Sequence, residues 1–268
     1  MMKTALTGVM SASRDLSVIS NNLANAMTVG FKRSTSQFVD VMGLSQNDRP
    51  GVDIGQGSMT QVVRRSDSQG NIRTTDSALD LALVGPGHFT FGEAGPANGE
   101  TSYIYSRSGQ LQITPTGQLV DRNSGRPLMA LTGGKPQPIN VTAATNGDLA
   151  GIQSLSIDTK GVISVSKLDG TITPLATLAI GRFTNEDGLK NQGGAAFMET
   201  DESGPVEIGR AGMNGFGVVR QGSLEDANVD MTAEMLRMIQ AQQAYNGNAR
   251  ALQTGSEMLR SSIETLTR

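Results

Sequence analysis

Both ends of the chain carry apolar residues at alternating spacings of three and four, which is the pattern of a helix with one narrow apolar stripe. We call each stripe a seam. The N-terminal seam comprises Met2, Ala5, Val9, Ala12, Leu16, Ile19, Leu23 and Ala26. The C-terminal seam comprises Met235, Met238, Gln242, Tyr245, Ala249, Leu252, Ser256, Leu259, Ile263 and Leu266. The pattern therefore predicts an amphipathic α-helix at each end of the chain.

The C-terminal helix has a clear predicted start. Asp230 is suited to cap it, and Glu234 falls in the first turn, where the helix dipole favours an anion. Gln242 and Ser256 interrupt the apolar seam, and Gly247 and Gly255 lower the intrinsic helicity. Two such helices are only marginally stable in water without a packing partner. That partner is either the rest of the same chain or another copy of it.

The middle of the chain changes to the pattern of short strands separated by glycine turns. Residues 103–121 alternate apolar and polar side chains around Gly109 and Gly117, and residues 154–183 do so around Gly161 and Gly170. The sequence thus predicts a mixed α and β protein, with a discontinuous helical coiled-coil domain from both termini and an all-β middle domain. The predicted segments are 1–42 (N-terminal helix and hairpin), 43–72 (extended linker), 73–219 (β domain) and 220–268 (C-terminal helix).

Three asparagines lie near the end of the first predicted helix, where their amides disfavour helical structure. Asn21, Asn22 and Asn25 fall outside the seam. We interpret them as a polar flank that hydrogen-bonds across a packed interface. Gly30 is expected to occupy the left-handed position that ends the helix, with Phe31 folding back on Ala26. We expect the seam residues other than Ser256, together with the three asparagines, to form inter-subunit packing.

The composition argues against several classes of function. The net charge is -3, with Lys and Arg scattered, so we expect no nucleic-acid partner. There is no cysteine, and His88 is the only histidine, so thiolate metal sites and multi-histidine sites are excluded. No phosphate-binding loop of the type GxxxxGK[ST] occurs. We therefore expect a protein that is not an enzyme, with no cofactor, no metal and no small-molecule substrate.

The sequence also shows neither the apolar run of a membrane-spanning helix nor the pattern of a cleavable secretion signal. No apolar run approaches the roughly 20 residues that a membrane-spanning helix needs. The N-terminal segment MMKTALTGVMSASRD lacks the continuous apolar stretch of a cleavable signal peptide, so we expect none.

Five blocks in order resemble the rod and hook family of bacterial flagellar axial proteins. They are LSVISNNLANAMTVGFKRS at the N-terminus, QGNIRTTDSALDLALVGPGHF, YSRSGQLQITPTGQLVD, FTNEDGLKNQGGAAFMETDESG, and QGSLEDANVDMTAEMLRMIQAQQAYNGNARALQTGSEML near the C-terminus. The order and number of the blocks make this resemblance specific. It is greatest to flagellar basal-body rod proteins.

The resemblance implies a structural subunit that the flagellar type III apparatus exports and that polymerises helically to transmit torque. Its implied partners are copies of itself, neighbouring rod and hook subunits and the export apparatus. Its implied location is the flagellar basal body, spanning the periplasm. The sequence leaves open whether the chain is a proximal rod, distal rod or hook-type subunit. An exported coiled-coil adhesin or filament protein is the alternative from another class.

Overall fold

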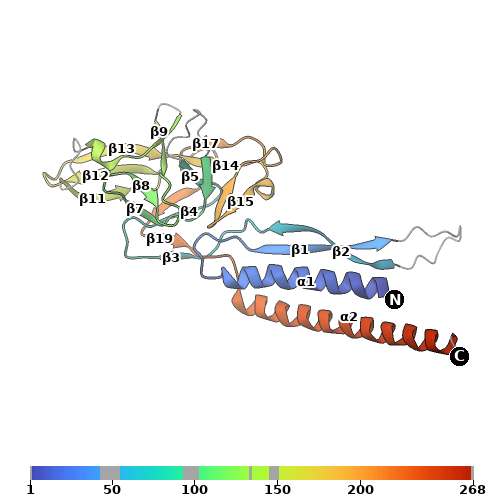
Figure 1. Ribbon diagram of the computed structural model, residues 1–268. Coiled ribbons are helices and arrows are strands. Elements are labelled where there is room, and N and C mark those ends of the chain that lie inside the picture. Colours follow the sequence, from blue (N-terminus) through green and yellow to red (C-terminus); the bar gives the residue numbers. More distant parts are fainter. Residues whose placement is uncertain (1, 43–54, 93–102, 133–134, 145–150, 267–268) are drawn as a thin grey trace. The chain divides into compact units, whose positions relative to one another are not determined.

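The chain forms two compact units in its computed structural model, which describes residues 2–42, 55–92, 103–132, 135–144 and 151–266 (Figure 1). Unit 1 comprises residues 1–26, 33–66 and 229–268, and unit 2 comprises residues 27–32 and 67–228. The chain therefore passes from one unit to the other after residues 26, 32, 66 and 228. Helices at both ends and a β-rich middle agree with the predicted mixed fold.

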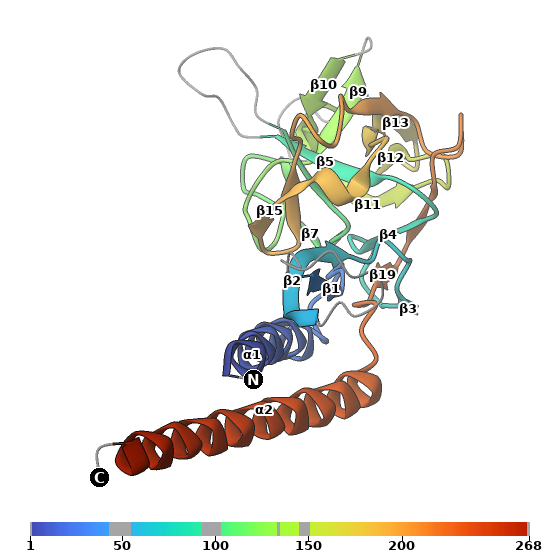
Figure 2. The ribbon, with the colours of Figure 1, turned by 90° about the vertical axis from the view of Figure 1, so that its right-hand side faces the viewer.

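Unit 1 consists of two helices and one hairpin. Helix α1 (Met2–Ala24) packs on α2 (Met231–Leu266) and also contacts both strands of an antiparallel hairpin, β1 (Ser34–Met42) and β2 (Gly55–Arg65). Figures 1 and 2 show that α2 is the longer of the two helices. Both helices carry exposed as well as buried residues, so each has only part of its surface covered within the chain.

The predicted cap of the C-terminal helix is confirmed. The Asp230 carboxylate accepts hydrogen bonds from the backbone N–H groups of Thr232 at 2.9 Å and Ala233 at 3.2 Å. These donors belong to the first turn, where no carbonyl within the helix can accept from them. The capping carboxylate thus defines where α2 begins.

The end of α1 differs from the prediction. The helix ends at Ala24, so Gly30 does not directly follow it. Gly30 has a φ of +71° and lies in a later turn, in which the Phe31 N–H donates to the Thr28 carbonyl at 3.2 Å. A Cβ at residue 30 would lie 2.6 Å from the backbone nitrogen of Ser108. Glycine is required here by the left-handed backbone and by this close approach, rather than by a helix cap.

Unit 2 is built from two larger antiparallel sheets and three strand pairs. The six-stranded sheet has the order β15 (Lys190–Gly193), β16 (Ala196–Met198), β6 (Tyr103–Ser106), β5 (His88–Gly92), β14 (Ile180–Arg182) and β17 (Glu207–Gly209). The five-stranded sheet has the order β10 (Lys135–Pro138), β9 (Met129–Thr132), β13 (Ile172–Leu178), β12 (Val162–Lys167) and β11 (Ile152–Ile157).

The remaining elements of unit 2 are short. The strand pairs are β4 (Leu81–Val84) with β18 (Val218–Gln221), β3 (Ile72–Thr74) with β19 (Ser223–Glu225), and β7 (Leu111–Ile113) with β8 (Leu119–Asp121). Two 3₁₀ turns, η1 (Val141–Ala144) and η2 (Glu186–Gly188), lie between strands.

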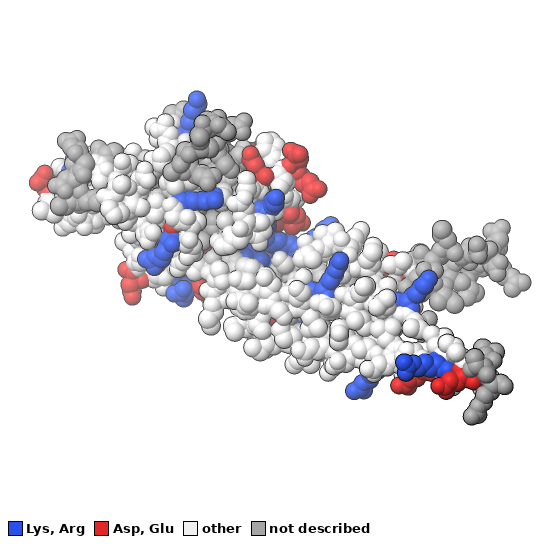
Figure 3. All heavy atoms as spheres, in the orientation of Figure 1, with Lys and Arg blue, Asp and Glu red and all other residues white. Residues whose placement is uncertain are grey.

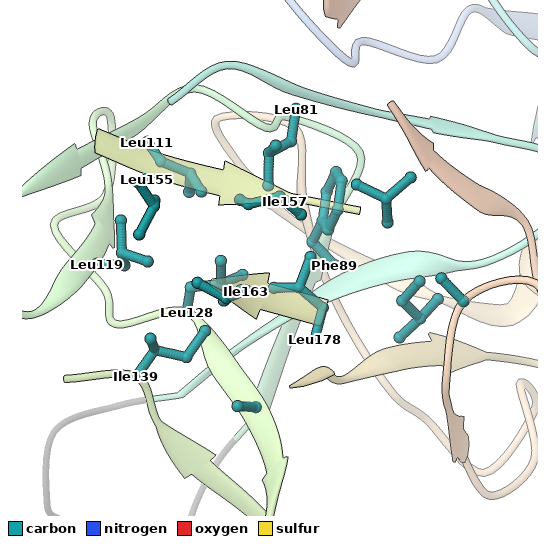
Figure 4. Packing of buried hydrophobic residues seen from close by; sticks show 14 of the residues in the cluster. Leu81, Phe89, Leu111, Leu119, Leu128, Ile139, Leu155, Ile157, Ile163 and Leu178 are labelled. Atoms are coloured by element: carbon teal, nitrogen blue, oxygen red, sulfur yellow. The ribbon is translucent and has the colours of Figure 1, made fainter. Parts of the chain in front are cut away.

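Glycine turns shape the hairpins as the sequence predicts. Gly117, Gly161 and Gly170 all have positive φ, and each donates its N–H to the residue three positions earlier. The strands that they connect supply apolar side chains to one core, among them Leu119, Ile163 and Leu178 (Figure 4). The alternation of apolar and polar residues in the sequence therefore corresponds to strands with one buried face.

A buried carboxylate joins remote segments within unit 2. Glu225 is 1% exposed, and one of its oxygens accepts from the Lys32 ammonium at 2.7 Å and from the Gly70 N–H at 3.0 Å. Its other oxygen lies 3.4 Å from the Arg107 guanidinium. Burial lowers the pKa of Lys32, whereas the negative charge of Glu225 acts in the opposite direction. We call these three charged residues the Glu225 cluster.

The Glu225 cluster explains why the unit boundaries differ from the predicted segments. Residues 27–32 and 220–228 were predicted in the helical domain but belong to unit 2. The reason is that Lys32 and Glu225 neutralise each other inside that unit. The predicted linker, 43–72, instead contains β2, which pairs with β1 in unit 1, whereas residues 43–54 of that prediction lie outside the described residues.

Replacing Glu225 by alanine should lower the free energy of unfolding by about 3–5 kcal/mol, because two buried cations lose their counter-charge. Urea denaturation followed by circular dichroism measures this loss. Glu207→Ala is the matched control, since Glu207 also lies 2.7 Å from an arginine, Arg182, but its side chain is 59% exposed. The control should lose less than about 1 kcal/mol. Equal losses in the two variants would contradict the role assigned to Glu225.

Candidate functional site

The N-terminal seam divides between buried and partly exposed positions. Ala5, Ala12 and Ile19 are buried in unit 1, whereas Val9, Leu16, Leu23 and Ala26 are partly exposed and Met2 is exposed. The buried positions recur every seven residues, which is the spacing predicted for one helix face. Ser11 and Asn22, which lie outside the predicted seam, are buried as well.

The C-terminal seam is much less covered within the chain. Met238, Ala249 and Leu252 are partly buried, whereas Met235, Gln242, Tyr245, Leu259 and Ile263 are exposed. The side chain of Leu266 lies outside the described residues. The buried residues that the seam missed are Glu234 and Ala241. They share a helix face with Met238 and Leu252, so the face turned toward α1 is displaced by about one residue from the predicted seam.

Close approach of the helices fixes α1 and α2 in an antiparallel register. A Cβ added at Gly8 would lie 2.7 Å from the Asn248 side chain, and one added at Gly255 would lie 3.2 Å from Met2. At the opposite end of the pair, Asn22 contacts Glu234. Gly255 therefore has a packing role that the sequence pattern, which marked it only as a weak helix former, did not reveal.

Asn22 connects three elements of unit 1. Its amide nitrogen donates to the Ser34 carbonyl at 2.7 Å and to the Glu234 carboxylate at 3.2 Å. Its amide oxygen accepts from the Ser34 N–H at 2.9 Å. One side chain thus joins α1 to the start of β1 and to the first turn of α2. All three bonds lie within the chain, so the burial of Asn22 serves the fold of unit 1.

Glu234 is the charged centre of the same contact. Its carboxylate lies 2.6 Å from the Arg33 guanidinium and 3.5 Å from that of Arg237. Its side chain is 2% exposed. We call Asn22, Arg33 and Glu234 the Glu234 cluster. The first-turn position of Glu234 was predicted, but its burial and its ion pair with Arg33 carry no signal in a single sequence.

The other two asparagines lie differently. The Asn25 amide donates to the Asn21 backbone carbonyl at 2.9 Å, and Asn21 is exposed. The Asn21 carbonyl also accepts from the Asn25 backbone N–H at 3.1 Å, so the amide adds a second bond to an acceptor in the last turn of α1. Asn21 and Asn25 therefore lie at the helix end, and their part in inter-subunit packing stays a prediction.

His88 packs against aromatic rings. It lies in β5, buried at the edges of Phe183 and Phe197, with ring centroids 6.1 and 5.9 Å away. Among the described residues no three His, Cys, Asp or Glu side chains lie together as metal ligands. A depression of about 600 Å³ is lined by Arg182, Glu207 and Phe216, where the arginine stacks over the aromatic ring. No helix in the described part of the chain is long and apolar enough to cross a membrane.

Two family models match the ends of the chain. One, described as flagella basal body rod protein, matches residues 2–32. The other, described as flagellar basal body rod FlgEFG protein C-terminal, matches residues 220–265. The matched segments include α1 and nearly all of α2, and they contain Asn22, Lys32, Glu225 and Glu234.

Curated relatives match over nearly the whole length. The flagellar basal-body rod protein FlgG of Buchnera aphidicola from Schizaphis graminum is 33% identical, covering 94% of this chain and 94% of its own. That of Caulobacter vibrioides is 32% identical, covering 98% of each chain. The crystal structure of Helicobacter pylori flagellar hook protein FlgE2 overlaps 47% of this chain and 30% of its own, with 21% identity and a TM-score of 0.24, too low to support an argument about the fold. From the relatives, the chain belongs to the family of flagellar basal-body rod proteins.

Proposed function

We propose that the chain is a structural subunit of the flagellar rod, which polymerises through unit 1 into a helical array with copies of itself and with neighbouring rod and hook subunits. Its function is to transmit torque through packing contacts. Membership of a family of structural rod proteins supports a role without catalysis.

The observation that carries the proposal is the incomplete burial of the two terminal helices. Both helices lie in segments that match rod-family models, yet large apolar side chains on each are exposed. They include Leu6, Met10, Met235, Leu236 and Leu259. Exposed apolar surface of this extent on paired helices favours association with further protein. A second copy is the partner that a polymer supplies.

The seams support a coiled-coil arrangement between copies. Alternating spacings of three and four let helices pack side chains into one another along their length. Contacts between different surfaces of successive copies do not close on themselves, so they generate an open helical array. The Glu234 cluster would hold α1 and α2 in one register while neighbouring copies cover their outer faces.

Export and location follow from the same proposal. The chain would leave the cytoplasm through the flagellar type III apparatus and occupy the basal body across the periplasm. Marginal helices could pass a narrow channel as coil and become ordered when neighbouring copies bury their seams.

Electron cryotomography of cells that lack the encoding gene tests the function. We expect basal bodies without structure beyond the inner-membrane ring, because the rod could not extend. A complete rod that ends at the outer membrane would instead identify a hook-type subunit. Normal flagella would contradict both assignments.

Coupling of folding to assembly predicts weak protection of the terminal helices in the dilute monomer. Backbone amides of α1 and α2 should exchange with deuterium much faster than those of β5 and β12, which lie in the core of unit 2. Hydrogen exchange with mass spectrometry measures this difference. Strong protection of both helices in the monomer would show that they fold without assembly.

Leu259→Asp should abolish incorporation into rods while unit 2 stays folded, because a charge would be buried in an apolar contact between copies. Leu23→Asp should have the same effect, although Leu23 is also partly covered within the chain. Leu168→Asp is the control, since Leu168 is exposed in unit 2. Counting rods in a complemented deletion strain is the measurement. If the Leu259→Asp chain assembled normally, the C-terminal seam would not be part of the interface between copies.

A further inference from the structure

The β1–β2 hairpin turns one face toward α1 and the other face outward. The face toward α1 carries Ser36 and Ser58 together with Phe38 and Val63. On the helix side, the Ser11 hydroxyl donates to the Ser58 carbonyl at 3.1 Å, and Ser36 bonds to Asp15. Because side chains alternate along a strand, neighbours of these serines point the other way. There Val39 pairs with Met59, and Gln37 pairs with Val62. We call Val39, Met59 and Val62 the hairpin patch.

The hairpin patch has no cover within the described residues. Met59 is 57% exposed, and Val39 and Val62 are exposed as well. The hairpin is a two-stranded sheet, so each strand also has one edge without a neighbouring strand in the described part of the chain. Two-stranded sheets are marginally stable alone. An apolar patch beside open strand edges is a surface for another protein segment.

A second uncovered apolar surface lies on the outer side of α2. Glu234 and Ala241 are buried, which places Leu236 and Ile239 on the side of the helix turned away from α1. Leu236 is 58% exposed and Ile239 is 51% exposed, with Met235 beside them. We call Met235, Leu236 and Ile239 the α2 patch.

The helix surface that continues from the α2 patch toward the C-terminus carries no charge over three turns, and the half-exposed Arg237 beside the patch pairs with Glu234 at 3.5 Å. Residues 238–249 contain no Asp, Glu, Lys or Arg, although most of them are exposed. Figure 3 shows mostly uncharged surface on the visible face of this part of the molecule. The exposed amides of Gln240 and Gln243 can both donate and accept. Amides of this kind can bond to backbone N–H and C=O groups of a strand edge.

From these two surfaces we infer that the hairpin patch of one copy packs on the α2 patch of the next copy. The inference rests on the proposed function, because it names the contact through which unit 1 polymerises. Pairing of two different surfaces is heterologous, and it leaves one free patch at each end of a growing array. Pairing of either patch with itself would close a two-fold dimer and end growth.

Cysteine cross-linking tests which surfaces meet. The natural chain has no cysteine, so every disulfide formed must come from introduced residues. Met59→Cys and Ile239→Cys chains, carrying different tags, would be produced together in the deletion strain and oxidised in purified basal bodies. We expect a cross-linked dimer that carries both tags. Leu168→Cys mixed with Ile239→Cys is the control and should give none. Dimers of Ile239→Cys with itself, or assembled rods without the mixed dimer, would overturn the inference.

Introducing opposite charges into the two patches gives an independent test, which does not require two cysteines to lie within disulfide-bonding distance. Met59→Lys and Ile239→Glu should each reduce the number of rods per cell by at least about tenfold, because each places a lone charge in an apolar contact. A chain with both substitutions pairs lysine with glutamate at every contact, so assembly should return in part. The control pair, Met59→Glu with Ile239→Glu, should not recover. Assembly unaffected by the single variants would contradict this contact alone, whereas a wild-type chain that never enters rods would contradict the proposed function.

Discussion

A buried carboxylate in each unit fixes the arrangement on which the rest of the protein depends. A buried charge without a partner is costly, so Glu225 and Glu234 each require cations or hydrogen-bond donors close by. Glu225 brings Lys32, Gly70 and Arg107 together, although they are far apart in sequence. The Glu234 cluster does the same for the end of α1, the start of β1 and the first turn of α2.

Adjacent residues of one short segment supply a cation to each cluster. Lys32 belongs to unit 2 and pairs with Glu225, whereas Arg33 belongs to unit 1 and pairs with Glu234. The chain therefore passes between the units directly between two anchored side chains. This explains why a Phe-Lys-Arg segment follows the turn at Gly30, and it gives both basic residues a structural role.

The Glu234 cluster also decides which helix surfaces remain for other copies. Once Asn22 and Arg33 hold Glu234, the register of α1 on α2 is set and Ala241 is covered. Leu236 and Ile239 then point away from α1. The hairpin is placed by the same cluster, because Asn22 bonds to both backbone groups of Ser34. Contacts within one copy thus prepare the surfaces that we assign to contacts between copies.

Local features of this protein are visible in its sequence, and remote ones are not. The Asp230 cap, the turns at Gly117 and Gly161, and the two helices all follow from short-range chemistry, and the structure has them. The end of α1 at Ala24 was missed because the heptad spacing continues to Ala26. The strand β2 was missed because its partner β1 lies beyond a segment of turn-forming residues. The ion pairs of Glu225 and Glu234 depend on which segments meet in the fold, and no spacing within one sequence encodes that.

Incorporation of a Glu234→Ala chain into rods tests the central claim most directly. Glu234 is buried, so its side chain is not available to a neighbouring copy, and any effect on assembly must act through the register of α1 and α2. Glu257→Ala, on the exposed surface of the same helix, is the control. The amount of each chain in purified basal bodies can be measured by quantitative immunoblotting. We predict that Glu257→Ala is incorporated normally and Glu234→Ala is not. Normal incorporation of Glu234→Ala would show that assembly does not depend on the buried cluster.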